Sequence, residues 1–154
     1  MKIYAWFGRA LYFLLLPLMR LLPPTTRVYV IVLNDQKEVL LVRNWFRHQR
    51  WTPPGGGARW GEHSQAAAVR EVREETGIPI AVSDLIDLGQ IDSVTGEIRA
   101  HITGYRTHAR GMPRLKGAFR RLEVLEVAWW PLAALPPDRA DLLNQLLKTA
   151  DLLE

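Results

Sequence analysis

Hydrophobic residues follow two periods along this chain of 154 residues, and each period predicts a different kind of element. Short runs rich in β-branched and aromatic residues are typical of strands, and they lie at 27–33, 38–43 and 122–130. The first two runs are separated by a three-residue polar turn, which predicts a hairpin. Alternating apolar and polar residues predict a half-buried strand over 98–107. The segment 80–91 predicts one irregular strand or two short ones.

Two helices are expected at different places in the chain. Ser64 is expected to cap the first, which runs to about Thr76 and ends at Gly77. Leucines at helical spacing predict the second over 139–153, with Asp138 as its cap.

The order of these elements predicts the fold class. Residues 53–57 (Pro-Pro-Gly-Gly-Gly) cannot continue a helix or a central strand, so they predict a loop after a short strand at Trp51-Thr52. The resulting order β-β-β-α-β-β-β-α places a mixed sheet between helices, which is an α/β layered architecture. No long linker interrupts residues 25–154, so we expect them to form one domain.

Residues 1–24 form a separate apolar segment. The stretch 3–22 is strongly apolar, but its longest uninterrupted run, 10–16, is far short of the roughly 20 residues that a spanning helix needs. Three interpretations stand: an N-terminal helix packed on the domain or on a second subunit of a homodimer, an interfacial membrane anchor, and a targeting segment.

Composition narrows the chemistry. The chain has no cysteine, which excludes disulfides, thiolate metal sites and a cysteine nucleophile, and which fits a cytoplasmic protein. Its net charge of +4 comes from dispersed Lys and Arg and favours anionic ligands. A nucleic-acid partner is not indicated, because no basic tract or RNA-binding aromatic motif occurs.

Three carboxylates fall on one arc of the first predicted helix. At about 100° per residue, Glu71, Glu74 and Glu75 span roughly 100° of its circumference. A narrow stripe beside this arc is expected to face the sheet, and it consists of Val69, Val72 and Thr76. The small side chains of Ala67 and Ala68, one turn earlier on the arc, are expected to leave room above it.

Two interpretations of this arc stand. It is either a solvated acidic face whose charge Arg70 and Arg73 offset, or a site for a hard divalent cation with oxygen ligands. The preceding segment favours the cation site, because three glycines let the backbone approach a metal or phosphate and Glu62 adds a fourth carboxylate.

Written out, the pattern is Gly56-x5-Glu62-x7-Arg70-Glu71-Val72-x-Glu74-Glu75-x-Gly77-Ile78. It resembles the signature of the Nudix hydrolases at every defined position. The resemblance extends to Trp51 and to residues 54–56 before the signature, and to residues 123–132 near the C-terminus, so that it covers about 25–150.

The resemblance implies an α/β/α sandwich that cleaves a nucleoside diphosphate linked to another moiety. The reaction is water attack on phosphorus, assisted by Mg²⁺, for which Mn²⁺ is a substitute. By position, the resemblance implies oxygen ligands for the metal from Glu71, Glu75, Glu74, the Gly55 carbonyl and Glu62.

The same resemblance implies roles for the remaining polar residues. Glu62 is expected either to bind a further ion or to hold Arg70, and Arg70 is expected to orient the glutamates. The general base is either a glutamate of the signature, such as Glu74, or a later carboxylate, with Glu123 ranked ahead of Glu97.

The substrate is less well defined by the sequence. Arg43, Arg47 and Arg50, with Trp45 and Phe46, are expected either to clamp phosphates and stack a base or to form a solvated loop. The markers of several Nudix subfamilies are absent after the signature, which leaves nucleoside triphosphates or similar diphosphates.

Two alternative functions also stand. The apolar stretch 3–22 motivates a membrane-associated hydrolase of a lipid-linked or isoprenoid diphosphate. A non-catalytic nucleotide-sensing module is the other, although the retention of all four glutamates argues against it.

Overall fold

Strict alternation of side chains along β1 (Thr26–Leu33) sets the two faces of the sheet. Val28, Val30 and Val32 pack on one face, in the cluster that contains residues of α2 (Ser64–Thr76). The residues between them, Tyr29, Ile31 and Leu33, pack on the other face with α3 (Asp141–Thr149). A continuous apolar run therefore forms a strand that is buried on both sides.

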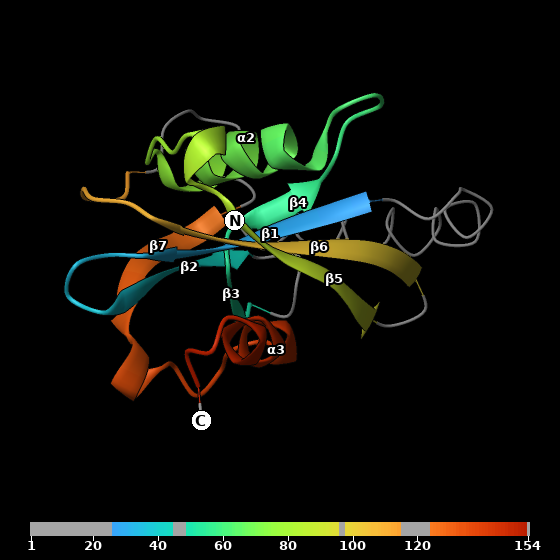
Figure 1. Ribbon diagram of the computed structural model, residues 1–154. Coiled ribbons are helices and arrows are strands. Elements are labelled where there is room, and N and C mark those ends of the chain that lie inside the picture. The colour runs from blue at the N-terminus through green and yellow to red at the C-terminus, as the bar shows by residue number, and fades with distance from the viewer. Residues whose placement is uncertain (1–25, 45–48, 96–97, 115–123, 154) are drawn as a thin grey trace, which may run out of the picture.

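The computed structural model describes residues 26–44, 49–95, 98–114 and 124–153. In Figure 1, α2 covers one face of the sheet and α3 covers the other, which confirms the predicted α/β sandwich. The N-terminal segment, Trp45, Phe46, Arg47, Glu97 and Glu123 lie outside the described residues, so their predicted roles stay predictions. Within the described ranges, no helix has the length and apolar character needed to cross a membrane.

Across the described residues, the sheet has seven strands. They are β1, β2 (Glu38–Asn44), β3 (Trp51–Thr52), β4 (Gly55–Gly57), β5 (Ile86–Thr95), β6 (Ile98–His108) and β7 (Val124–Pro131). The main path runs β3-β2-β1-β6-β5, with β4 paired to β1 and β7 paired to β2. Only the β1–β6 pairing is parallel among the described strands, so the sheet is mixed. Two 3₁₀ turns, Val82–Asp84 and Leu132–Ala134, precede β5 and follow β7.

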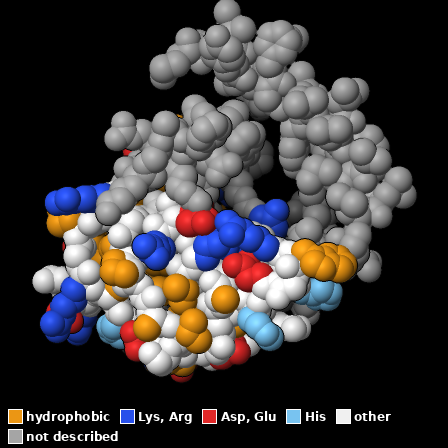
Figure 2. All heavy atoms as spheres, turned by 90° about the horizontal axis from the view of Figure 1, so that it is seen from above, with side chains coloured by type: hydrophobic (Ala, Val, Ile, Leu, Met, Phe, Trp, Pro, Cys, Tyr) orange, Lys and Arg blue, Asp and Glu red, His pale blue; other side chains and the backbone are white. Residues whose placement is uncertain are grey.

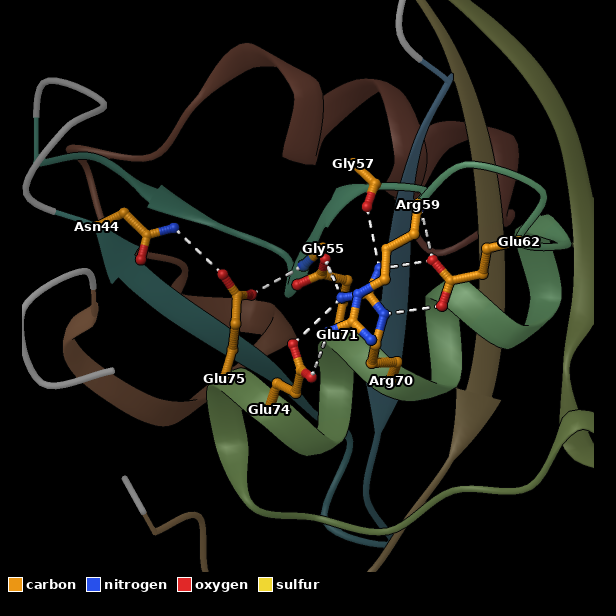
Figure 3. Close-up of polar contacts among 9 residues, drawn as sticks. All are labelled: Asn44, Gly55, Gly57, Arg59, Glu62, Arg70, Glu71, Glu74 and Glu75. Atoms are coloured by element: carbon orange, nitrogen blue, oxygen red, sulfur yellow. Dashed lines mark hydrogen bonds and ion pairs between the residues drawn. The ribbon is translucent and has the colours of Figure 1, made fainter. Parts of the chain in front are cut away.

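The strands β1 and β2 form the predicted hairpin but separate soon after the turn. Their recorded register is the single pair Leu33↔Val39. Toward its start, β1 pairs instead with β4. β2 pairs with β7 along its whole length, and its far end also pairs with β3 on the other side. This separation leaves the end of β2 and the glycines of β4 on two sides of the same region, under the C-terminal half of α2 (Figure 3).

Two predicted helix caps were wrong. Ser64 is the first residue of α2, whose N-cap is His63, and its hydroxyl lies 2.7 Å from the Tyr105 hydroxyl. Asp138 does not cap α3, whose N-cap is Ala140, because the Asp138 carboxylate binds Arg43. In both cases a partner distant in sequence takes the side chain that a local rule assigns to the helix end.

Two expectations around the signature also change. Gly55–Gly57 is a short strand and not a loop, because its backbone completes the edge of β1. Ala67 and Ala68 are fully buried in the cluster between α2 and the sheet, so they belong to the sheet-facing side of the helix and not to an open acidic face. The buried face of α2 therefore overlaps one edge of the acidic arc. Glu75 lies in this overlap, and only 9% of its surface is exposed. The Gly77 end of the helix is confirmed, with φ 73° and its N–H donated to the Arg73 carbonyl.

The α3 face gives a direct test of the core. Leu143 is fully buried in the α3-face cluster, whereas Leu125 on β7 is 44% exposed. We expect Leu143→Ala to lower the free energy of unfolding by about 2–5 kcal/mol, because the substitution leaves a cavity. Leu125→Ala is the matched control and should cost less than about 1 kcal/mol. Denaturant titration of both variants measures the difference, and equal losses would contradict this assignment of the core.

Candidate active site

The backbone of β4 lies tightly against β1, and this contact requires glycine. Gly55 pairs with Tyr29, and the flanking bonds Val30 N–H to Pro54 O (3.0 Å) and Ala58 N–H to Thr26 O (2.9 Å) hold the segment in register. A Cβ at Gly55 would overlap the Val28 carbonyl and would lie 2.7 Å from the Tyr29 ring. Because the glycines of β4 have no side chains, their backbone can lie directly under α2, next to its glutamates.

Arg70 lies at the centre of the carboxylates (Figure 3). Its Nε and Nη2 each donate to Glu62 at 2.8 Å. On its other side, Nη1 donates to Glu71 at 2.7 Å and to Glu74 at 3.1 Å, and Nη2 also donates to the Gly57 carbonyl at 3.0 Å. A guanidinium presents five donors in a rigid plane, so one side chain connects the loop, the helix and β4.

This network shifts the pKa values of its members in opposite directions. Hydrogen bonds from the Arg70 side chain, followed by the one from the Arg59 backbone, lower the pKa of Glu62 to about 2. The same bond to Glu62, with those to Glu71 and Glu74, raises the pKa of Arg70 against the effect of burial. Burial also raises the pKa of Tyr29 to about 12, with Glu75 and Glu71 adding to the rise. Glu62 is therefore ionised and Tyr29 protonated at neutral pH.

The depressed pKa of Glu62 makes its contribution to stability depend on pH. Because the folded-state pKa of about 2 lies below the ordinary value of 4.5, this stabilisation is fully present above pH 4.5 and is lost as the pH falls toward 2. We expect the difference in free energy of unfolding between wild type and Glu62→Gln to be constant from about pH 7 to 5 and to shrink at lower pH. Urea titrations in EDTA measure it, and a difference that stays flat down to pH 3 would contradict the Arg70–Glu62 assignment.

Glu75 occupies a different position from the Arg70 network. Its Oε2 accepts the Gly55 N–H at 2.9 Å, and its Oε1 lies 3.5 Å from the Asn44 amide nitrogen. Its carboxylate thus lies between the end of β2 and the start of β4 (Figure 3). A buried carboxylate requires such donors, because desolvation without them is costly.

The donor chemistry of this site fits a hard divalent cation. The carboxylates of Glu71, Glu74 and Glu75 lie beside the backbone of β4, and all of these groups offer oxygen. A Cβ on Gly56 would lie 2.7 Å from the Glu71 carboxylate, so glycine keeps the space next to that oxygen open.

In the described part of the chain, however, no three acidic or histidine side chains are already arranged around a metal position. Arg70 is bonded to Glu62, Glu71 and Glu74, and it therefore holds these carboxylates in their present orientation. Of the two predicted roles of Glu62, the contacts match the one in which it holds Arg70.

Of the predicted substrate-binding arginines, Arg43 and Arg50 lie within the described residues, and Arg43 is directed away from the carboxylates. Arg43 lies on the α3 face of the sheet, 5.1 Å above the Trp51 ring and in ion pairs with Asp138 and Glu126. Arg50 is exposed and lies directly before β3. A phosphate clamp that includes Arg43 and Arg50 stays a prediction, and the position of Arg43 on the opposite face from Glu75 gives it no support.

Two polar residues near the carboxylates were missed by the sequence analysis. Arg59 lies 3.4 Å from Glu74, and its backbone N–H donates to Glu62 at 2.8 Å. Asn44 approaches Glu75 from the end of β2. Arg59 falls at a position that the signature leaves undefined, and Asn44 lies far from the signature in sequence, so neither carried a local signal.

The surface around the site is mixed in charge. Seen from the α2 side, acidic and basic side chains lie next to one another on this face (Figure 2). A hollow of about 450 Å³ lies elsewhere, at the β1–β2 turn, and its lining residues include Asp35, Arg110, Met112 and Trp129 but none of the site carboxylates. The chemistry of the glutamates is thus not located in that hollow.

The fold and the carboxylate–arginine cluster define an α/β sandwich with an acidic helix packed on a glycine strand. The sequence profile of the NUDIX domain matches residues 23–149, and the chain therefore belongs to the Nudix family. A solved structure, the MutT Nudix hydrolase from Burkholderia pseudomallei, matches 83% of this chain and 98% of that chain, with a TM-score of 0.70 and 22% identity. At that identity the match shows the shared fold.

Two curated relatives match shorter stretches of sequence. A candidate mutator protein MutT4 of Mycobacterium tuberculosis is 43% identical over 90 residues, which are 56% of this chain and 34% of the relative. A candidate 8-oxo-dGTP diphosphatase of Bacillus subtilis is 42% identical over 66 residues, which are 43% of this chain and 44% of the relative. The match thus spans less than half the length of each of these relatives.

Proposed function

We propose that this chain hydrolyses the pyrophosphate bond of a nucleoside diphosphate-linked substrate with the help of Mg²⁺. The observation that carries the proposal is the link between the acidic arc of α2 and the backbone of β4. Glu75 accepts the Gly55 N–H, and Arg70 joins Glu71 and Glu74 to the Gly57 carbonyl. Membership of the Nudix family supports it, because divalent metal ions are general in that family.

In this proposal, Glu71, Glu74, Glu75 and the Gly55 carbonyl hold the cation. Bound Mg²⁺ would offset charge on the phosphate oxygens and lower the pKa of the attacking water. Arg70 positions Glu71 and Glu74 through its two Nη1 bonds and is itself held by Glu62. A glutamate of the signature, such as Glu74, is the general base in one form of the proposal, and Glu123 is the base in the other.

We further propose that the substrate is a nucleoside triphosphate or a similar diphosphate. The net charge of +4 favours anionic ligands in general. The name of the Bacillus subtilis relative, a candidate 8-oxo-dGTP diphosphatase, makes 8-oxo-dGTP the first compound to test.

A substrate panel tests the proposed function. The purified full chain would be assayed with the common nucleoside triphosphates, 8-oxo-dGTP, ADP-ribose, a diadenosine polyphosphate and an isoprenoid diphosphate, with Mg²⁺, Mn²⁺ or EDTA. We expect metal-dependent release of pyrophosphate or phosphate from a nucleotide and none in EDTA. Tight nucleotide binding with no release from any compound would overturn the proposal in favour of a sensing module. Hydrolysis of the isoprenoid diphosphate alone would overturn the proposed substrate class.

A further inference from the structure

Asn44 ends β2 at an irregularity in the sheet. The pairing of β2 with β7 shifts register between Arg43 and Asn44, so that Arg43 faces Glu126 and Asn44 faces Val124. Bulges of this kind re-aim a side chain and are frequent next to active sites. The neighbouring residue Arg43 packs toward α3, whereas Asn44 points to Glu75 on α2 (Figure 3).

The amide of Asn44 is only half satisfied. Its nitrogen faces Oε1 of Glu75 at 3.5 Å, while its oxygen is buried and has no hydrogen-bond partner among the residues that the structure describes. A buried acceptor without a donor lowers stability. Most buried polar groups in proteins are paired, and exceptions call for an explanation. Packing alone does not explain an asparagine at this position, because an apolar side chain of similar size would fill the same space without burying an unpaired polar atom.

We infer that Asn44 is a positioning residue for Glu75, an inference that rests on the proposed function of Glu75 in metal binding. Gly55 holds Oε2 of Glu75 from β4, and Asn44 approaches Oε1 from β2. The two donors come from β4 and from the end of β2, on two sides of the same carboxylate, so together they fix its plane. The long Asn44 contact is of the kind that tightens when a bound complex forms.

This role makes a distinctive prediction for Asn44→Leu. Groups that orient a metal ligand typically contribute 10–100-fold to metal affinity or activity. We expect Asn44→Leu to weaken Mn²⁺ binding and to lower kcat, each by about tenfold, with a smaller change in KM. Because the substitution removes an unpaired buried oxygen, the Tm of the metal-free protein should stay the same or rise.

Asn34→Leu is the matched control. The Asn34 side chain lies in the β1–β2 turn, where it donates to Glu38 at 2.7 Å and accepts two backbone N–H groups at 3.0 Å. Its replacement should lower the Tm and leave Mn²⁺ affinity and kcat unchanged. The two asparagines should therefore give opposite patterns, one affecting the metal site and the other affecting stability.

A double-mutant cycle with Glu75→Gln tests whether Asn44 acts through Glu75. We expect the effect of Asn44→Leu on kcat to fall to less than about twofold in the Glu75→Gln background, because the two residues share one contact. If the effects of the two substitutions on kcat are additive, or if Asn44→Leu leaves Mn²⁺ affinity unchanged, the positioning role of Asn44 is overturned while the proposed function still stands. Absence of Mn²⁺ binding by the wild-type chain, with no effect of Glu75→Gln, would overturn the proposed function as well.

Discussion

Glu75→Gln is expected to lower kcat by about three orders of magnitude, or ~4 kcal/mol in activation free energy. Glutamine keeps an oxygen that can accept the Gly55 N–H, so the local backbone should be retained. What the variant loses is one negative charge beside the proposed cation position. Steady-state assays with the best substrate of the panel, over a range of Mg²⁺ concentrations, measure this effect.

The stability of the same variant separates chemistry from folding. Glu75 is 9% exposed, and a buried carboxylate is costly to desolvate, so the free energy of unfolding should stay the same or rise on replacement by glutamine. Glu126→Gln is the matched control, because Glu126 lies on the α3 face with a 56% exposed side chain. Its kcat should stay within about twofold of wild type. Full activity in Glu75→Gln would refute the assigned site.

The structure shows why neither sequence interpretation of the acidic arc was complete. The side chains of Glu71 and Glu74 are 13% and 23% exposed, so the arc is not a freely solvated face. The repulsion expected of three clustered carboxylates is offset by Arg70, which bonds to two of them and to Glu62. The ion pairs with Arg70 therefore stabilise the clustered carboxylates without a bound cation.

Local patterns predicted the elements well where one face or both faces are apolar. The runs in β1 and β2, the alternation in β6, the leucines of α3 and the Gly77 end of α2 were all predicted at or near their positions. These signals work because burial and backbone conformation act within a few residues of sequence.

The features that the sequence did not reveal depend on contacts between distant segments. Ser64 contacts Tyr105, Asp138 binds Arg43, and Asn44 approaches Glu75, each across more than 30 residues. The pairing of Gly55–Gly57 with β1 is also a long-range contact, and composition alone indicated a loop. The signature identified the carboxylates, but the residues that orient them became visible only with the fold.

Gly56→Ala is expected to lower kcat by about a hundredfold while leaving the protein folded. The added Cβ would lie 2.7 Å from Oε1 of Glu71, a separation that real Cβ atoms do not adopt. Because the atoms in its way are the end of a flexible side chain, the Glu71 carboxylate should move aside and the backbone should remain in place. A displacement of about 1 Å in a group that positions the reaction can cost 10²-fold in rate.

Gly57→Ala provides the comparison, because a Cβ at that neighbouring position would meet nothing within 4 Å. Both substitutions remove one glycine from β4, so any general effect of alanine on this strand is shared. Assays of kcat and Mn²⁺ affinity should therefore show a large loss for Gly56→Ala and a change of less than about twofold for Gly57→Ala. Equal losses of kcat in the two variants would contradict the idea that the reaction requires open space beside the Glu71 carboxylate. The expected contrast would instead place the requirement at the Glu71 carboxylate, since that group is what the Gly56 methyl displaces.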